Sequence, residues 1–221
     1  MELLDWLFIG LLSLAILSLI FLLVFLTLWV TNGGKLKKLQ EAKPKKKKKR
    51  KRWRRECRQA QQKKRRALRW LLIFLILTGI GAGGAFYTRY YQATNLMQED
   101  SDALIQGYFL LTSIEEQLNQ VQGTDNPKKV QGTIYELSAR LANYGARRAS
   151  GRLSVEGQTL LNRLYVNMKE LGLNLGNQTV ETLQNQEALD GYLADLEKTT
   201  TNQKKVFEHF RINEESLKQR K

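Results

Sequence analysis

The side chains best suited to covalent chemistry are few and far apart. Among 221 residues there is one histidine, His209, and one cysteine, Cys57. A thiol and an imidazole form a nucleophilic pair only within hydrogen-bonding reach of each other. The charge pattern described below puts Cys57 and His209 on opposite sides of a membrane, so we expect no such pair. Because Phe207 and Phe210 flank His209, we expect this imidazole at the edge of a hydrophobic core.

Three neighbouring carboxylates, Glu99, Asp100 and Asp102, form a local acidic cluster that could attract a cation. Their spacing is not that of a calcium loop, and we expect a solvated helix surface. The sequence also lacks zinc-ligand spacing and a glycine-rich phosphate loop after a strand. It therefore predicts no catalytic residue, no metal site and no cofactor, and a protein that is not an enzyme.

The positive charge is concentrated in one segment. Twenty of the 35 residues from Lys35 to Arg69 are basic, and only Glu41 and Glu56 are acidic. The formal net charge of +15 comes from this segment, because residues 92–221 hold 15 bases and 17 acids. A nearly neutral C-terminal part argues against a nucleic-acid-binding globular domain, which would be basic on a folded face.

Two apolar segments flank the basic segment, and each is long enough to cross a membrane. Trp6–Val30 has no charged residue, and 18 of its 25 residues are Leu, Ile, Phe or Val. Trp70–Tyr91 follows the basic segment and has aromatic residues at both ends. An acidic start and a long apolar run are untypical of a cleaved signal peptide, so we expect a retained anchor.

The position of the basic segment predicts the topology, because loops rich in Lys and Arg stay in the cytoplasm. Both chain ends then lie on the extracytoplasmic side. The exported part has no cysteine, which is more common in bacteria than in secreted animal proteins, because the latter often use disulfides. We therefore expect a bacterial plasma membrane. The predicted domains are an external tail (1–5), a first span (6–30), a cytoplasmic loop (31–69), a second span (70–91), an extracytoplasmic bundle (92–212) and a polar tail (213–221).

The basic loop has three interpretations that remain open. It acts as a topology signal, or it also binds anionic lipid headgroups, which attract bases near the surface, or it binds nucleic acid or an acidic cytoplasmic protein. Self-repulsion predicts that the lysine run is extended, whereas residues 53–69 favour a helix. Nucleic acid is a poor partner, since Trp53 is a lone aromatic residue here. The candidate lipid-binding residues are Lys45, Lys46, Lys47, Lys48, Lys49, Arg50, Lys51, Arg52, Arg54, Arg55, Lys63, Lys64, Arg65 and Arg66.

The second span contains small residues four positions apart, which lets helix backbones approach closely. These are Gly79 with Gly83 and Thr78 with Ala82. We expect them to pack against the first span or against a second copy of the chain, which would make a homo-oligomer.

Residues 92–212 carry a helical pattern, with apolar residues three and four positions apart in four stripes. Asn126 followed by Pro127 predicts one helix start and Ser154 another, whereas Gly176 predicts a left-handed helix end. The sequence thus predicts an all-α fold, with a two-span transmembrane hairpin and a C-terminal antiparallel bundle of about four helices.

An exported bundle without catalytic residues is typical of a protein that works by contact. We expect an interaction or scaffold protein, such as an accessory subunit of a secretion, conjugation, division or wall-assembly complex, whose envelope partner is unidentified. An extracytoplasmic sensor that needs a separate transducer is the alternative. A holin-like pore protein is a third possibility, although it has no need of a large exported bundle.

Overall fold

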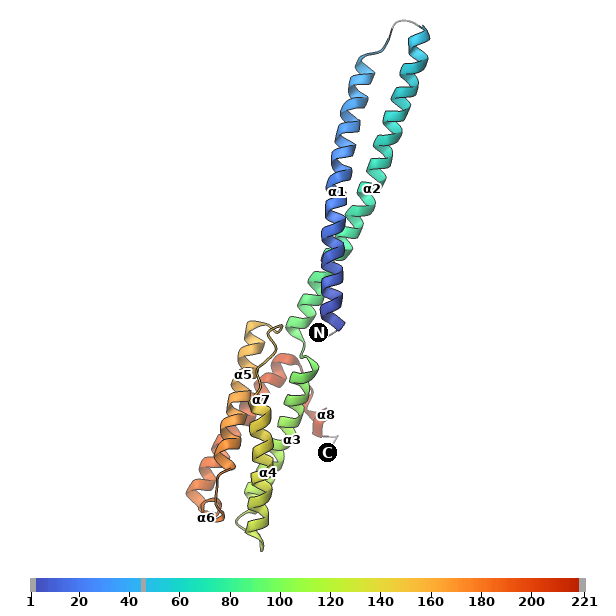
Figure 1. Ribbon diagram of the computed structural model, residues 1–221. Coiled ribbons are helices and arrows are strands. Elements are labelled where there is room, and N and C mark those ends of the chain that lie inside the picture. The colour runs from blue at the N-terminus through green and yellow to red at the C-terminus, as the bar shows by residue number, and fades with distance from the viewer. Residues whose placement is uncertain (1–2, 45–46, 219–221) are drawn as a thin grey trace. The chain divides into compact units, whose positions relative to one another are not determined.

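The computed structural model describes residues 3–44 and 47–218, and within that part of the chain every regular element is a helix. The predicted all-α class is therefore confirmed. The chain divides into two compact units, Met1–Tyr90 and Tyr91–Lys221, and each is described by itself. Figure 1 shows the helices of both units.

The first unit consists of two long antiparallel helices, α1 (Leu3–Glu41) and most of α2 (Lys47–Thr94). Both are long and apolar enough to cross a membrane. In the most apolar 18 residues of each, only 11% and 17% of the residues are buried. Each helix also continues past its apolar part into the basic segment. The prediction of an extended lysine run is wrong from Lys47 onward, because α2 begins there.

The two helices meet along a seam in which buried and half-buried residues alternate three and four positions apart. This seven-residue repeat is that of a left-handed coiled coil. On α1 the seam comprises Leu4, Phe8, Leu11, Ala15, Ser18, Leu22, Phe25, Trp29, Asn32, Leu36 and Leu39. On α2 it comprises Trp53, Cys57, Ala60, Lys64, Ala67, Leu71, Phe74, Thr78, Gly81, Ala85 and Thr88.

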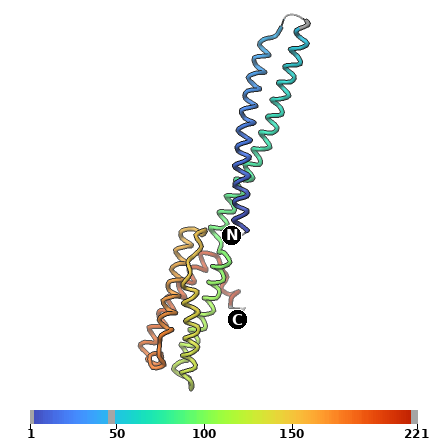
Figure 2. The backbone as a smooth tube through the Cα atoms, in the orientation of Figure 1, coloured from blue at the N-terminus to red at the C-terminus, as the bar shows by residue number. Residues whose placement is uncertain are grey.

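Contacts along the seam fix its antiparallel register. The Trp53 indole Nε1 donates a hydrogen bond to the Leu39 carbonyl oxygen at 2.6 Å. Further along, the Lys64 ammonium lies 5.2 Å from the centre of the Trp29 ring. The hairpin is therefore paired well beyond its apolar part, as the tube in Figure 2 also shows.

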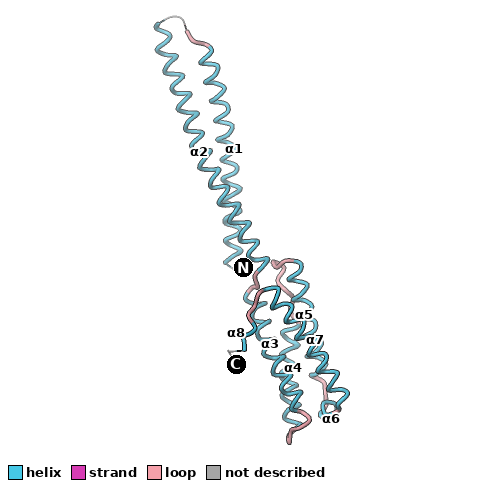
Figure 3. The backbone as a smooth tube through the Cα atoms, turned by 180° about the vertical axis from the view of Figure 1, so that it is seen from behind, coloured by secondary structure: helices cyan, strands magenta, loops and turns pink. Residues whose placement is uncertain are grey.

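The second unit is a bundle of four main helices with two short ones. The main helices are α3 (Gln98–Gln120), α4 (Pro127–Gly145), α5 (Val155–Leu175) and α7 (Gln186–Phe210). The short helices are α6 (Val180–Gln184) and α8 (Glu214–Lys218). Figure 3 shows the loops that join them. The largest fully buried side chains include Leu104, Ile114, Ile134, Leu164, Tyr165 and Met168.

The helix starts predicted for the bundle are confirmed. The Asn126 side chain accepts a hydrogen bond from the Lys129 amide at 3.2 Å, and Pro127 is the first residue of α4. The Ser154 hydroxyl accepts a hydrogen bond from the Gly157 amide at 3.1 Å. Each cap satisfies one of the amides that a helix leaves without an internal partner.

One expectation about a helix end is wrong. Gly176 ends α5 in a right-handed conformation with φ −65°, and its amide donates to the Gly172 carbonyl oxygen at 3.0 Å. The helix of the second span is separate from the first bundle helix, because α2 ends at Thr94 and α3 begins only at Gln98. Neither end required the positive φ that glycine tolerates better than other residues.

Candidate interaction surfaces

The structure places most of the predicted lipid-binding residues on one helix. Lys49 to Arg66 lie in α2, and apart from the half-buried Lys64 the candidates there are exposed. Lys45 and Lys46 lie outside the described residues, and for Lys47 and Lys48 only the backbone is described. Arg52 forms an ion pair with Glu56, 3.2 Å apart, on a highly exposed flank of the helix.

Five cations toward the start of α2 line one continuous surface hollow: Arg50, Lys51, Arg54, Arg55 and Arg58. We call this group the distal cationic face. Its members recur at i, i+4 and i+8, so they share one side of the helix. The seam residues Trp53 and Cys57 face α1 instead.

Distance along α2 separates the distal cationic face from the cations nearer the apolar segment. Lys63, Arg65 and Arg66 lie four to seven residues before Trp70, or about 6–10 Å at a rise of 1.5 Å per residue. Arg58 and Arg50 lie about 18 Å and 30 Å before Trp70 on the same measure. The described candidate lipid-binding residues of α2 thus form two groups at different distances from the apolar segment.

The small residues predicted for close packing divide between two sides of α2. The hydroxyl oxygens of Thr78 and Ser18 lie 3.0 Å apart, so Thr78 faces α1. Gly79 and Gly83 have no atom within 4 Å of a Cβ built on them, and Ala82 is exposed. Within the hairpin these three residues do not pack against α1.

Gly81 and Gly84, which the four-residue spacing does not select, make the close approach to α1. A Cβ on Gly81 would lie 3.0 Å from the Ala15 backbone nitrogen, and a Cβ on Gly84 would lie 3.0 Å from Leu11 Cδ1. The alternating three- and four-residue spacing of the seam would have identified Gly81, because Gly81 follows Phe74 by one heptad. Spacing by four residues alone selects the wrong side of a supercoiled helix.

A buried polar network joins the start of α3 to the α4–α5 loop. The Tyr165 hydroxyl donates to Asp100 Oδ1 at 2.9 Å, and the Ser150 amide donates to Asp100 Oδ2 at 3.0 Å. The Ser154 amide adds a bond to the Ala93 carbonyl oxygen at 3.0 Å. Burial raises the pKa of Tyr165, and the Asp100 carboxylate raises it further.

The expectation that Asp100 is solvated is therefore wrong, since Asp100 is 5% exposed and both of its oxygens accept hydrogen bonds. Glu99 is exposed, as predicted. Among the described residues no group of three His, Cys, Asp or Glu side chains could hold a metal ion. The role of Asp100 is to hold the α4–α5 loop.

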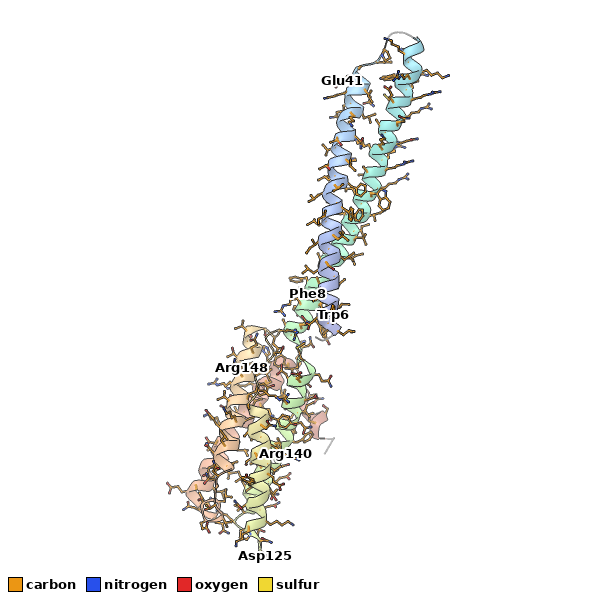
Figure 4. All side chains as sticks on the ribbon, viewed as in Figure 1. Trp6, Phe8, Glu41, Asp125, Arg140 and Arg148 are labelled. Carbon is orange, nitrogen blue, oxygen red and sulfur yellow. The ribbon has the colours of Figure 1, made fainter. Side chains whose placement is uncertain are left out.

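His209 is half-buried, and its ring lies edge-on to Phe210 with centroids 4.8 Å apart. This is the core-edge position predicted from the flanking phenylalanines. The α4–α5 loop carries Arg148 at one end of the bundle, whereas Asp125 lies at the other end of α4 (Figure 4). The surface of the bundle exposes a few large apolar side chains: Tyr135, Val155, Val166 and Leu173.

Comparison with known proteins adds no relative to these observations. No protein-family model, no curated protein and no solved structure matches this chain.

Proposed function

We propose that this protein is an integral membrane interaction protein. A two-span hairpin anchors it, its helical bundle binds a protein partner in the bacterial envelope, and the part of its basic segment next to the spans contacts anionic lipid from the cytoplasm. The observation that carries the proposal is a hairpin whose apolar side chains remain exposed over the apolar part of both helices, joined to a bundle that has its own core.

Energetics support the membrane as the surroundings of the hairpin. Eighteen Leu, Ile, Phe and Val residues in Trp6–Val30 favour insertion by roughly 5–11 kcal/mol, at about 0.3–0.6 kcal/mol each. Side chains such as Ile16 and Leu23 are 53% exposed, although both lie in the middle of α1. Pairing of α1 with α2 buries one stripe of side chains on each helix. The remaining apolar side chains are exposed, and a lipid bilayer is the surrounding in which their exposure is favourable.

The charge distribution supports a cytoplasmic basic segment and an exported bundle. A labelling experiment tests this topology. Substitution C57S removes the one native thiol, after which V155C adds a thiol to the bundle and Q59C adds one to the basic segment. Val155 is 83% exposed and Gln59 is exposed, so both thiols should react.

A membrane-impermeant maleimide should label V155C on intact cells, and it should label Q59C only after lysis. The reverse pattern would reject the proposed orientation. Labelling of both sites on intact cells would reject the hairpin as a two-span anchor.

The bundle supports a contact function because it has its own core and still exposes some apolar side chains on its helices. Val166 and Leu173 lie seven residues apart on α5, and each is 51% exposed. Seven residues correspond to about two helical turns, so the two side chains share a face. Isolated exposed apolar residues are ordinary, but a pair on one face is a reasonable place to search for a partner.

Photocrosslinking in the native membrane tests the partner. A photoreactive residue at Leu173 should yield one discrete adduct with an envelope protein. The same residue at Gly191, which has open space around it on α7, is the matched control and should yield less of that adduct. The absence of any adduct from a series of positions around the bundle would refute a stable envelope partner.

A further inference from the structure

We propose that the distal cationic face of α2 is a docking surface for an acidic helical segment of a cytoplasmic protein. The inference rests on the proposed topology, which puts this face in the cytoplasm. Neither the membrane topology of the hairpin nor lipid binding by its basic segment requires this additional partner.

The distal cationic face is too far from the apolar segment for lipid headgroups to be its partner. Arg58 lies about 18 Å and Arg50 about 30 Å along the helix from Trp70. The potential of an anionic membrane surface falls off within a Debye length, about 8 Å at physiological salt. A tilt of about 20° would shorten these heights by less than a tenth and would not bring the face to the lipid.

The helix is also held away from the bilayer by its pairing with α1. α2 is one unbroken helix from Lys47 to Thr94. The bond from Trp53 Nε1 to the Leu39 carbonyl oxygen, 2.6 Å long, ties its distal part to α1. To lie on the membrane surface, α2 would have to break between Trp53 and Trp70 and lose this pairing. The two helices run side by side through this region in Figures 1 and 2.

The chemistry of the distal cationic face suits carboxylates at helical spacing. Four of its five cations are arginines, whose planar guanidinium groups bind carboxylates through two parallel hydrogen bonds. Arg50, Arg54 and Arg58 rise about 6 Å from one to the next. Glutamates at i, i+4 and i+8 of a partner helix have the same rise. Within the described residues, none of the three arginines has an ion-pair partner.

The same geometry disfavours nucleic acid. The major groove of a DNA duplex is about 12 Å wide and admits a single helix. Here α1 covers the opposite side of α2 as far as Leu39, so a pair of helices would have to enter. A stacking platform for single strands is also missing from the described part of this face, because the indole of Trp53 faces the seam.

Binding to the full chain tests the proposal. The protein is placed in nanodiscs of phosphatidylcholine, which carries no net charge, so lipid does not compete. The probe is a labelled synthetic helical peptide with glutamates at i, i+4 and i+8, and a 20-base-pair DNA duplex is the comparison ligand. The variant R50Q/R54Q/R58Q removes three charges from the distal cationic face. The variant K35Q/K37Q/K38Q removes three exposed charges from α1 and is the matched control.

We expect the distal variant to bind the acidic peptide about tenfold more weakly than the unaltered chain, and the control variant to change binding by less than about twofold. Circular dichroism should show unchanged helix content in both, since glutamine is a good helix former. Equal losses in the two variants would mean diffuse attraction and would overturn the proposal. So would tighter binding of the duplex than of the peptide, or no binding of the peptide.

Nanodiscs expose both faces of the bilayer, so this result does not depend on which side is the cytoplasm. A failure of the proposed topology would appear in the maleimide experiment alone. A failure of the docking surface would appear in the peptide experiment alone.

Discussion

Arg211 shows how a single residue carries a conformational cost. It closes α7 with φ 56° and ψ 41°, and it is the one non-glycine residue with positive φ among those described. The next amide, of Ile212, donates to the Phe207 carbonyl oxygen at 2.8 Å, which completes the helix end. A left-handed conformation costs a residue with a Cβ about 1–2 kcal/mol.

The substitution R211G should therefore raise the free energy of unfolding by about 0.5–1 kcal/mol, because glycine relieves the strain but loses more chain entropy. The urea midpoint of the fragment 92–221 measures the effect. Arg140 is exposed within α4, so R140G should lower stability by about 1 kcal/mol and serves as the control. A destabilised R211G would show that the arginine side chain itself stabilises the helix end.

The Tyr165 hydroxyl is a second group whose single interaction can be tested. Tyr165 is 1% exposed, and its hydroxyl donates a hydrogen bond to Asp100, which is also buried. Removal of the hydroxyl in Y165F leaves a buried carboxylate with one fewer partner, which should cost about 1–3 kcal/mol. The variant Y135F is the control. Its free energy of unfolding should change by less than about 0.5 kcal/mol, because Tyr135 is 56% exposed. Equal effects of the two substitutions would contradict a role for the hydrogen bond.

The same hydroxyl predicts a pH dependence. Burial and the Asp100 carboxylate raise the pKa of Tyr165 in the folded state, whereas an unfolded tyrosine ionises near pH 10. Its contribution to stability is complete below about pH 10 and decreases above it, by up to about 1.4 kcal/mol per pH unit. The stability difference between the unaltered fragment and Y165F should therefore shrink between about pH 10 and 11. A constant difference would refute the coupling.

At the scale of elements, periodicity and capping predicted most of the fold. The four amphipathic stripes became α3, α4, α5 and α7, and Asn126 and Ser154 cap their helices as expected. α7 runs unbroken through Thr199–Thr201, where Thr199 is 2% exposed, so packing against the bundle outweighs the low helix propensity of threonine. Composition likewise could not reveal that Asp100 is buried, since this depends on Tyr165, which lies 65 positions away.

The hairpin seam was harder to predict than the bundle. Spacing by four residues selected Gly79 and Gly83, whereas supercoiling follows a 3.5-residue period and brings Gly81 to α1. The substitution G81L should separate the helices, because its Cβ alone would already lie 3.0 Å from the Ala15 backbone nitrogen. G79L adds the same side chain where no atom lies within 4 Å, so it is the matched control.

Disulfide formation reports the packing of the hairpin. In a C57S background, cysteines replace Ser18 and Thr78, whose hydroxyl oxygens are 3.0 Å apart. We expect G81L to slow formation of this disulfide about tenfold or more and G79L to leave it nearly unchanged, since only G81L forces the backbones apart. Slower oxidation in G79L than in G81L would show that the other face of α2 meets α1.

At the scale of the whole chain, the net charge of +15 comes from the basic segment, and its described cations from Lys49 to Arg69 lie along one helix, α2. Sequence composition predicted which segment carries the positive charge. It did not predict how far each cation lies from the apolar segment, because that distance depends on α2 being helical from Lys47. We expect a straight helix to separate its cations by partner: those within about 10 Å of the apolar segment should meet lipid, and those about 18 Å or more away should not.

This sorting gives a prediction for lipid binding. In nanodiscs that contain phosphatidylglycerol, the variant K63Q/R65Q/R66Q should lose anionic lipid from the annulus that native mass spectrometry detects. Three bases near the surface are worth about 3 kcal/mol together, or about two orders of magnitude in affinity, at low salt. R50Q/R54Q/R58Q removes the same charge about 18–30 Å from Trp70 and should retain the lipid. If both variants lost lipid equally, α2 would have to bend onto the membrane, and the assignment of the distal cationic face to a protein partner would fall with the straight rod.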